Sequence, residues 1–240
     1  MKTNITRHIP NVFTLFNLLS GGLSIVFSFQ GELTWAGIMI MIGAGFDFLD
    51  GTMARLLHAF STLGKELDSL SDLVSFGVAP AMLVYALING GFLGPDFPFW
   101  FPFIGFLIMA CAALRLARFN IDPEQSVPFK GMPVPAGALF IAAYPFLLRQ
   151  PDLFYLPAFN SLLMIGVWSV FIAVMFLIPM PLFSLKFKKL NLKDNFSRYL
   201  FLLISLILLL VYQIPAIPLM IILYIFISVF IRLRYHAINK

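Results

Sequence analysis

The chain has 240 residues, of which 60% are hydrophobic and only 11% are charged, and its mean hydropathy is +0.94. A soluble domain would carry about 25% charged residues, so the composition excludes an ordinary water-soluble domain and indicates a membrane protein. The net charge is +5. No basic patch is interleaved with stacking aromatic residues on a soluble module, so we expect no nucleic-acid partner.

Apolar segments follow one another along the chain, and each is close to the ~20 residues that cross a bilayer as a helix. Helices satisfy their own backbone groups in lipid, whereas open strands do not. We therefore predict an all-α polytopic bundle of about eight transmembrane helices, at 10–29, 33–56, 68–89, 98–119, 133–149, 159–183, 197–213 and 216–235. The short, proline-marked turn between the last two leaves one re-entrant or interrupted element as the alternative.

The basic residues predict the orientation of these helices. Fifteen of the 16 lysines and arginines fall on one side of the eight-span arrangement, and Arg149 falls on the other. By the positive-inside rule the crowded side is cytoplasmic, so we expect both termini inside and a location in the cytoplasmic (inner) membrane, in contact with membrane lipids. Asn11 and Asn17 interrupt the first apolar run, so we expect a retained span rather than a cleaved signal peptide.

Four of the 11 acidic residues are aspartates that lie at the end of the second predicted span and near the start of the third. Asp47 and Asp50 are spaced i, i+3, and Asp68 and Asp72 are spaced i, i+4, so each pair shares one helix face. If the two helices lie side by side, four like charges converge and require a cation among them. Mg²⁺ or Mn²⁺ takes oxygen ligands and shares its shell with substrate phosphates. The stretch therefore predicts a metal-dependent catalytic site at the cytoplasmic interface.

The spacing Asp-x-x-Asp-Gly-x-x-Ala-Arg-x8-Gly-x3-Asp-x3-Asp, from Asp47 to Asp72, resembles the signature of the CDP-alcohol phosphatidyltransferases at every fixed position. The resemblance implies an enzyme that transfers a phosphate-linked group from a CDP-alcohol to a second alcohol. It also implies one membrane domain over residues 1–240, with a catalytic core at about 10–150 and additional spans at about 159–235. Members of the family are usually homodimers, so a homodimer is expected here.

The same resemblance implies roles for the motif residues. Asp47, Asp50 and Asp68 are expected metal ligands, and Asp72 is expected to be the general base and a further metal ligand. The residues expected to contact the cytidine or its phosphates are Gly51, Ala54, Arg55, Gly64, Asn17 and Thr14. Small residues permit close approach of a nucleotide, and arginine pairs with phosphate. For the glycines and Asn17, tight helix packing or interhelical hydrogen bonding is the alternative.

Two further segments concern the acceptor alcohol. Residues 9–22 and 114–137 resemble the membrane-bound bacterial phosphatidylserine synthases within this family. That implies CDP-diacylglycerol and L-serine as substrates, and phosphatidylserine and CMP as products, in phospholipid biosynthesis. The residues expected to bind the serine carboxylate or a lipid phosphate are Arg115, Arg118, Asn120 and Lys130. For the three cations the positive-inside rule is the alternative explanation.

Other functions compete with this interpretation. The core motif is shared with enzymes that use other alcohols, so glycerol 3-phosphate or inositol phosphate is the nearest alternative acceptor. A cation-coupled transporter would also use paired intramembrane aspartates, but these aspartates fall at one interface and the two halves of the chain show no repeat. A non-catalytic lipid-binding scaffold would explain the hydrophobicity but not the spacing of the four aspartates.

Overall fold

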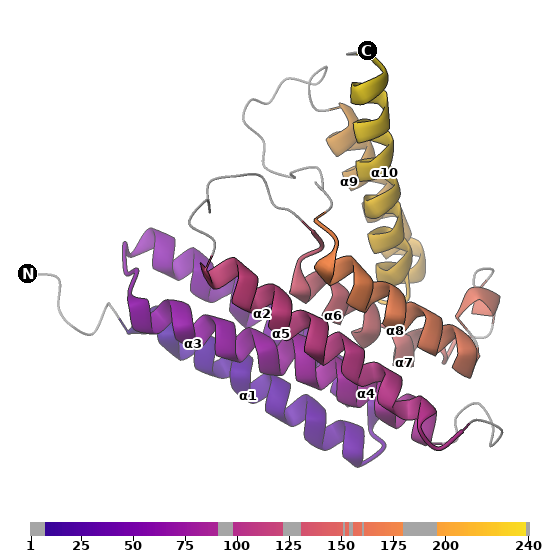
Figure 1. Cartoon of the computed structure of the whole chain (residues 1–240), viewed down its shortest axis with the longest axis horizontal. Coiled ribbons are helices and arrows are strands. Elements are labelled where there is room, and N and C mark those ends of the chain that lie inside the picture. Colours follow the sequence, from indigo (N-terminus) through magenta and orange to yellow (C-terminus); the bar gives the residue numbers. More distant parts are fainter. Residues whose placement is uncertain are drawn as a thin grey trace, which may run out of the picture.

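The computed structural model consists of helices and the turns between them in the part of the chain that it describes, and no strand occurs there (Figure 1). The described residues are 8–90, 98–121, 131–150, 152–153, 156–159, 161–179 and 196–238. The helices are α1 (Ile9–Phe29), α2 (Leu33–Leu56), α3 (Thr62–Asp72), the π-helix η2 (Leu73–Val78), α4 (Ala79–Asn89), the 3₁₀ helix η3 (Phe101–Gly105), α5 (Phe106–Ile121), α6 (Val134–Ala142), α7 (Tyr144–Leu147), the 3₁₀ helix η4 (Leu156–Ala158), α8 (Leu162–Leu177), α9 (Phe196–Tyr212) and α10 (Ala216–Ile238). The predicted all-α class is confirmed.

The helix lengths fit an integral membrane protein. Four stretches of the described residues are long and apolar enough to cross a bilayer, namely Ile9–Phe29, Leu33–Leu57, Thr62–Asn89 and Phe101–Ile121. The other predicted spans correspond to shorter apolar helices, at Val134–Leu147, Leu162–Leu177, Arg198–Tyr212 and Ala216–Phe230. Each predicted span is thus helical. The number that crosses the bilayer and the side on which the termini lie stay predictions.

The third predicted span starts earlier than expected, at Thr62 instead of position 68. The Ser61 hydroxyl caps the helix by accepting a hydrogen bond of 2.9 Å from the Gly64 backbone N–H, which satisfies one of the orphan donors of the first turn. The first two turns carry Lys65 and Glu66, so hydropathy alone did not detect them. The span is also continuous with η2, a short π-helix that follows Asp72 directly.

The fifth and sixth predicted spans also differ in detail. The fifth is two helices, α6 and α7, which meet at Ala143. Pro145 lacks an N–H group and therefore cannot continue the hydrogen-bond pattern of α6. The sixth, predicted at 159–183, is α8, and the final predicted residues lie beyond the described part of the chain.

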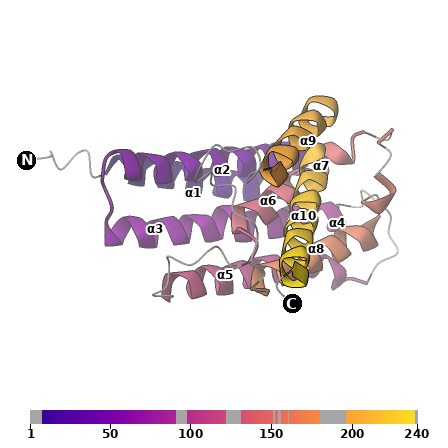
Figure 2. The same cartoon turned by 90° about the horizontal axis from the view of Figure 1, so that it is seen from above.

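The arrangement of the helices gathers distant parts of the sequence at one end of the bundle. The start of α1, the end of α2, the start of α3 and the end of α5 lie together there (Figure 2). The hairpin of α9 and α10 crosses the other helices at a steep angle (Figures 1 and 2). The last two predicted spans correspond to the two helices α9 and α10, and Gln213, with φ 54°, lies in the turn between them. That both helices cross the bilayer stays a prediction, with a re-entrant element as its alternative.

Helix α1 buries a face made of small and polar residues. They are Pro10, Thr14, Asn17, Ser20, Gly21, Ser24 and Ser28. The opposite face carries large apolar side chains such as Leu15, Leu19 and Leu23, which are 45–60% exposed and suit contact with lipid. Small residues let helix backbones approach closely in a membrane, where apolar burial between helices gives little driving force. The Ser24 hydroxyl donates to the Ala36 carbonyl at 2.9 Å and ties α1 to α2.

Two adjacent glycines of α1 allow this close packing to be tested. A Cβ atom added at Gly21 would lie 2.7 Å from the Ser75 Cα atom, whereas one at Gly22 would meet no atom within 4 Å. We expect Gly21→Ala to destabilise the protein by about 1–3 kcal/mol through overpacking. Gly22→Ala should be neutral or stabilising, because alanine favours a helix over glycine by about 1 kcal/mol. Thermal unfolding in detergent micelles measures both changes, and equal effects of the two substitutions would contradict the packing described here.

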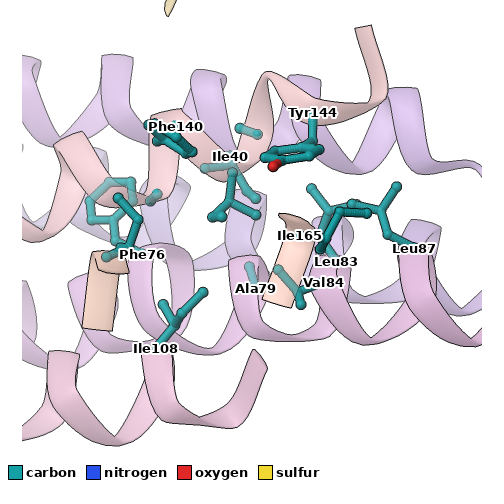
Figure 3. Packing of buried hydrophobic residues seen from close by; sticks show 14 of the residues in the cluster. Ile40, Phe76, Ala79, Leu83, Val84, Leu87, Ile108, Phe140, Tyr144 and Ile165 are labelled. Carbon is teal, nitrogen blue, oxygen red and sulfur yellow. The ribbon is translucent and has the colours of Figure 1, made fainter. Parts of the chain in front are cut away.

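The apolar core fixes the helices that carry the aspartates. Figure 3 shows buried side chains from α2, η2, α4, α5, α6, α7 and α8, among them Ile40, Phe76, Ala79, Leu83, Val84, Leu87, Ile108, Phe140, Tyr144 and Ile165. Ile40 on α2 and Phe76 on η2 are fully buried. They lie in the same continuous helices as Asp50 and Asp72, respectively. Packing of this core therefore holds the two acidic helix segments in a fixed relation.

Candidate active site

Three of the four motif aspartates, two on α2 and one on α3, converge in the structure, which the sequence predicted on the condition that the two helices lie side by side. One carboxylate oxygen from each of Asp47, Asp50 and Asp68 can be chosen so that all three lie within 4.8 Å of one another. Asp47 and Asp50 come from the last turns of α2, and Asp68 comes from the last turns of α3. The cluster is partly withdrawn from solvent, and Asp50 is only 6% exposed.

Asp72 lies at the edge of this cluster. Its Oδ1 atom accepts a hydrogen bond of 3.2 Å from Asn17 Nδ2 on α1. The carboxylates of Asp47, Asp50 and Asp68 all lie close enough to repel its charge. The fourth aspartate is thus turned toward both α1 and the other acidic side chains.

The donor set fits a hard divalent cation. Asp50 Oδ2 and Asp68 Oδ1 are buried atoms that have no hydrogen-bond partner in the described structure. A buried carboxylate oxygen without a donor is costly, and several close together repel one another. An ion such as Mg²⁺ or Mn²⁺ binds carboxylate oxygens and removes both costs. The acidic cluster is therefore suited to metal binding.

Gly51, Ala54 and Arg55 differ in how much space surrounds them. A Cβ atom added at Gly51 would meet nothing within 4 Å, so there is open space beside α2 at this point. Arg55 is exposed, and its Nε donates to the Gly51 carbonyl at 2.9 Å, which holds the guanidinium against the backbone at Gly51. Ala54 is half-buried. Gly51 and Arg55 thus flank a surface that a phosphate could approach.

Gly64 and Thr14 contact protein atoms. A Cβ atom at Gly64 would lie 3.0 Å from Ser61 Oγ and 3.1 Å from Asn11 Oδ1, so glycine here permits α1 to approach the start of α3. Thr14 is 3% exposed, and its hydroxyl donates to the Pro10 carbonyl at 3.1 Å. The Thr14 side chain also lies beside the Asp50 carboxylate.

The residues predicted to bind the acceptor differ in their exposure and in the contacts that the structure describes. Arg115 is half-buried and donates from its Nη2 atom to the Gly131 carbonyl at 3.3 Å. Arg118 is exposed near the end of α5. Asn120 donates from Nδ2 to Ser69 Oγ at 2.8 Å. Lys130 lies outside the described residues.

Serines that the sequence analysis did not single out attach the acidic helix to its neighbours. Ser71 donates to the Thr14 carbonyl at 2.9 Å, and Ser75 donates to the Asn17 carbonyl at 2.8 Å. Ser69 bonds Asn120 of α5, as described above. The signal was the recurrence of serine at positions 69, 71 and 75 beside two intramembrane aspartates, because small polar residues in apolar helices often form interhelical hydrogen bonds.

Known proteins are similar to this chain over more than half of its length. The chain is 39% identical over 141 residues to the archaetidylserine synthase of Methanothermobacter thermautotrophicus, which covers 57% of each protein. It is 37% identical over 144 residues to the CDP-diacylglycerol–serine O-phosphatidyltransferase of Bacillus subtilis, covering 58% of this chain and 76% of that protein. The enzyme of the same name from Saccharomyces cerevisiae is 36% identical over 163 residues, covering 61% of this chain and 56% of that protein.

The similarity thus spans little more than half the length of the archaeal and yeast relatives. Residues 7–179 match the CDP-alcohol phosphatidyltransferase family. That match includes the four converging aspartates and ends just after α8, so that α9 and α10 lie beyond it. The chain belongs to the CDP-alcohol phosphatidyltransferase family.

Proposed function

We propose that this protein transfers a phosphatidyl group from CDP-diacylglycerol to L-serine, giving phosphatidylserine and CMP. The observation that carries the proposal is the convergence of Asp47, Asp50 and Asp68 beside Asp72, in a chain of this family. The choice of serine rests on the relatives, because the bacterial and yeast proteins are named for serine as acceptor. The family match argues against the transporter alternative.

The proposed reaction joins the serine hydroxyl oxygen to the phosphorus atom that carries diacylglycerol. The bond from this phosphorus to the bridging oxygen of the pyrophosphate breaks, and CMP leaves with that oxygen. Asp72 takes the proton of the serine hydroxyl, which is the role of a positioned general base. When a divalent ion is bound by Asp47, Asp50 and Asp68, its contribution is to shield the negative charge of the pyrophosphate.

The setting of the reaction is part of the proposal. Asp47 and Asp50 lie in the last turns of α2, and Asp68 in the last turns of α3. We assign this part of the bundle to the cytoplasmic interface because most basic residues are expected on that side. A lipid substrate can enter this position from the bilayer, and serine from the cytosol. We further propose that the protein acts in the cytoplasmic membrane as a homodimer, and that Gly51, Ala54 and Arg55 face the nucleotide.

A panel of acceptors tests the proposed substrate. Purified protein in detergent is supplied with CDP-diacylglycerol, Mg²⁺ or Mn²⁺, and one of serine, glycerol 3-phosphate or inositol phosphate, and the lipid product is identified by mass spectrometry. We expect phosphatidylserine from serine and little product from the other two. If product forms mainly from glycerol 3-phosphate or inositol phosphate, the protein is still a CDP-alcohol phosphatidyltransferase, but serine is not its acceptor.

Arg115 and Arg118 of α5, together with Lys130 farther along the sequence, provide a test of how serine is held. A charge-assisted hydrogen bond to the serine carboxylate contributes about 1.5–3 kcal/mol. Replacing the responsible residue among Arg115, Arg118 and Lys130 with alanine should therefore raise the KM for serine roughly tenfold to a hundredfold, with a smaller change for CDP-diacylglycerol. Arg149→Ala, on the predicted opposite side, is the matched control. If the KM values for serine and for CDP-diacylglycerol are unchanged in all three variants, these cations do not bind substrate and only set the orientation of the helices in the membrane.

A further inference from the structure

Asn17 is a buried amide in the middle of α1 that faces the acidic site. The residue is 0% exposed, although an amide in an apolar helix is costly to bury without partners. Its Nδ2 atom donates to Asp72 Oδ1 at 3.2 Å. The only group that the described structure shows bonded to this side chain is thus the carboxylate that we propose as general base.

The backbone at Asn17 is held by the same helix that carries Asp72. Ser75, one turn after Asp72, donates its hydroxyl to the Asn17 carbonyl at 2.8 Å, and Ser71 donates to the Thr14 carbonyl at 2.9 Å. These bonds fix the height of Asn17 along α1 relative to Asp72. These two hydrogen bonds, in addition to side-chain packing, therefore keep the Asn17 amide opposite the Asp72 carboxylate.

The other end of the amide indicates that its orientation matters. Asn17 Oδ1 is buried and has no hydrogen-bond partner among the residues that the structure describes. It lies over α2, where a Cβ atom added at Gly43 would be only 3.0 Å away. Turning the amide around would place this oxygen against the Asp72 carboxylate, which would repel it. Glycine at position 43 thus provides the room in which Asn17 can direct its donor to Asp72.

We propose that Asn17 is a positioning residue for Asp72, an inference that rests on the proposed function. Its N–H group engages one carboxylate oxygen of Asp72 and fixes the rotation of the group, so that the second oxygen is available to take the proton of the acceptor hydroxyl. Asn17 makes no bond in the reaction itself. Its effect on rate passes through Asp72, in the manner of the outer partners that orient functional groups.

Substitutions on both sides of this contact separate positioning from simple helix packing. Asn17→Ala should lower kcat about tenfold to a hundredfold and leave the KM for CDP-diacylglycerol and the Tm nearly unchanged. Gly43→Ala removes no polar group but presses on Asn17 Oδ1, so it should lower kcat in the same way by a smaller factor. Gly45→Ala is the matched control on the same helix, because a Cβ atom there meets nothing within 4 Å.

A double-mutant cycle gives the decisive outcome. The rate of phosphatidylserine formation is measured with radiolabelled serine for Asn17→Ala, Asp72→Asn and the double variant. If Asn17 acts through Asp72, the double variant should be no slower than Asp72→Asn alone, since residues that act as a unit are not additive. Full multiplication of the two losses, or an unchanged kcat in Asn17→Ala and Gly43→Ala, overturns the inference. Absence of phosphatidylserine formation by the parent protein would instead refute the proposed function.

Discussion

Replacing Asp72 with asparagine is expected to lower the turnover number about 10²- to 10⁴-fold, the usual loss when a positioned general base is removed. Asparagine has nearly the same shape as aspartate, and its carbonyl oxygen can still accept the hydrogen bond from Asn17 Nδ2. It cannot take a proton near neutral pH. The KM for CDP-diacylglycerol should therefore change little, because the loss lies in the chemical step.

The control for this variant is Glu66→Gln. Glu66 is also an acidic residue of α3, but it is exposed near the start of the helix. Its replacement removes one negative charge without touching the site, so turnover should stay near that of the parent. An Asp72→Asn protein that turns over like the parent would show that another group accepts the proton, and the role of Asp72 would be withdrawn.

Removal of divalent cations is expected to abolish turnover altogether. Asp50 Oδ2 and Asp68 Oδ1 are buried and have no hydrogen-bond partner in the described part of the chain. One carboxylate oxygen from each of Asp47, Asp50 and Asp68 lies within 4.8 Å of the other two. Among the contacts that the structure describes, no lysine or arginine pairs with these carboxylates, so a bound cation is needed to offset their charge. Treatment with EDTA should stop CMP release, and added Mg²⁺ or Mn²⁺ should restore it. Full activity in chelator-treated protein is the result that would refute the metal site.

Binding of the ion can be followed without any substrate. Mn²⁺ affinity is measured by electron paramagnetic resonance for the parent, Asp50→Ala and Asp68→Ala. We expect each ligand substitution to weaken binding more than about a hundredfold, beyond the loss typical of outer partners. Glu66→Ala should bind Mn²⁺ like the parent. Equal affinity in Asp50→Ala would place the ion elsewhere.

The acidic cluster was predictable from the sequence because helix periodicity alone puts Asp47 near Asp50 and Asp68 near Asp72. That the two pairs meet was only a conditional expectation, because it requires the two helices to bring these faces together; in the structure α1 packs against both α2 and α3. The start of α3 was wrong by several residues, since Ser61 caps polar turns that hydropathy does not register. The roles assigned to the aspartates stay predictions, although their convergence is confirmed for Asp47, Asp50 and Asp68.

Contacts between helices were much less predictable. Asn17 and Asp72 are 55 positions apart, and whether they meet depends on the rotation and height of α1 against α3. Asn120 was predicted to contact substrate, and in the structure it is bonded to Ser69, a partner that no spacing rule gives. The π-helix after Asp72 likewise changes the phase of the following turns. Sequence patterns identified the chemical groups, while packing determined their partners.

A CMP-release assay with purified protein tests most directly whether the site formed by the four aspartates catalyses the transfer of a phosphatidyl group to serine. CDP-diacylglycerol is supplied with and without serine, each with and without Mg²⁺ or Mn²⁺, and CMP and phosphatidylserine are quantified together. We predict that CMP forms only when serine and the cation are both present, in equal amount to phosphatidylserine. If CMP release is unchanged without serine or without the cation, the site does not catalyse metal-dependent transfer to serine.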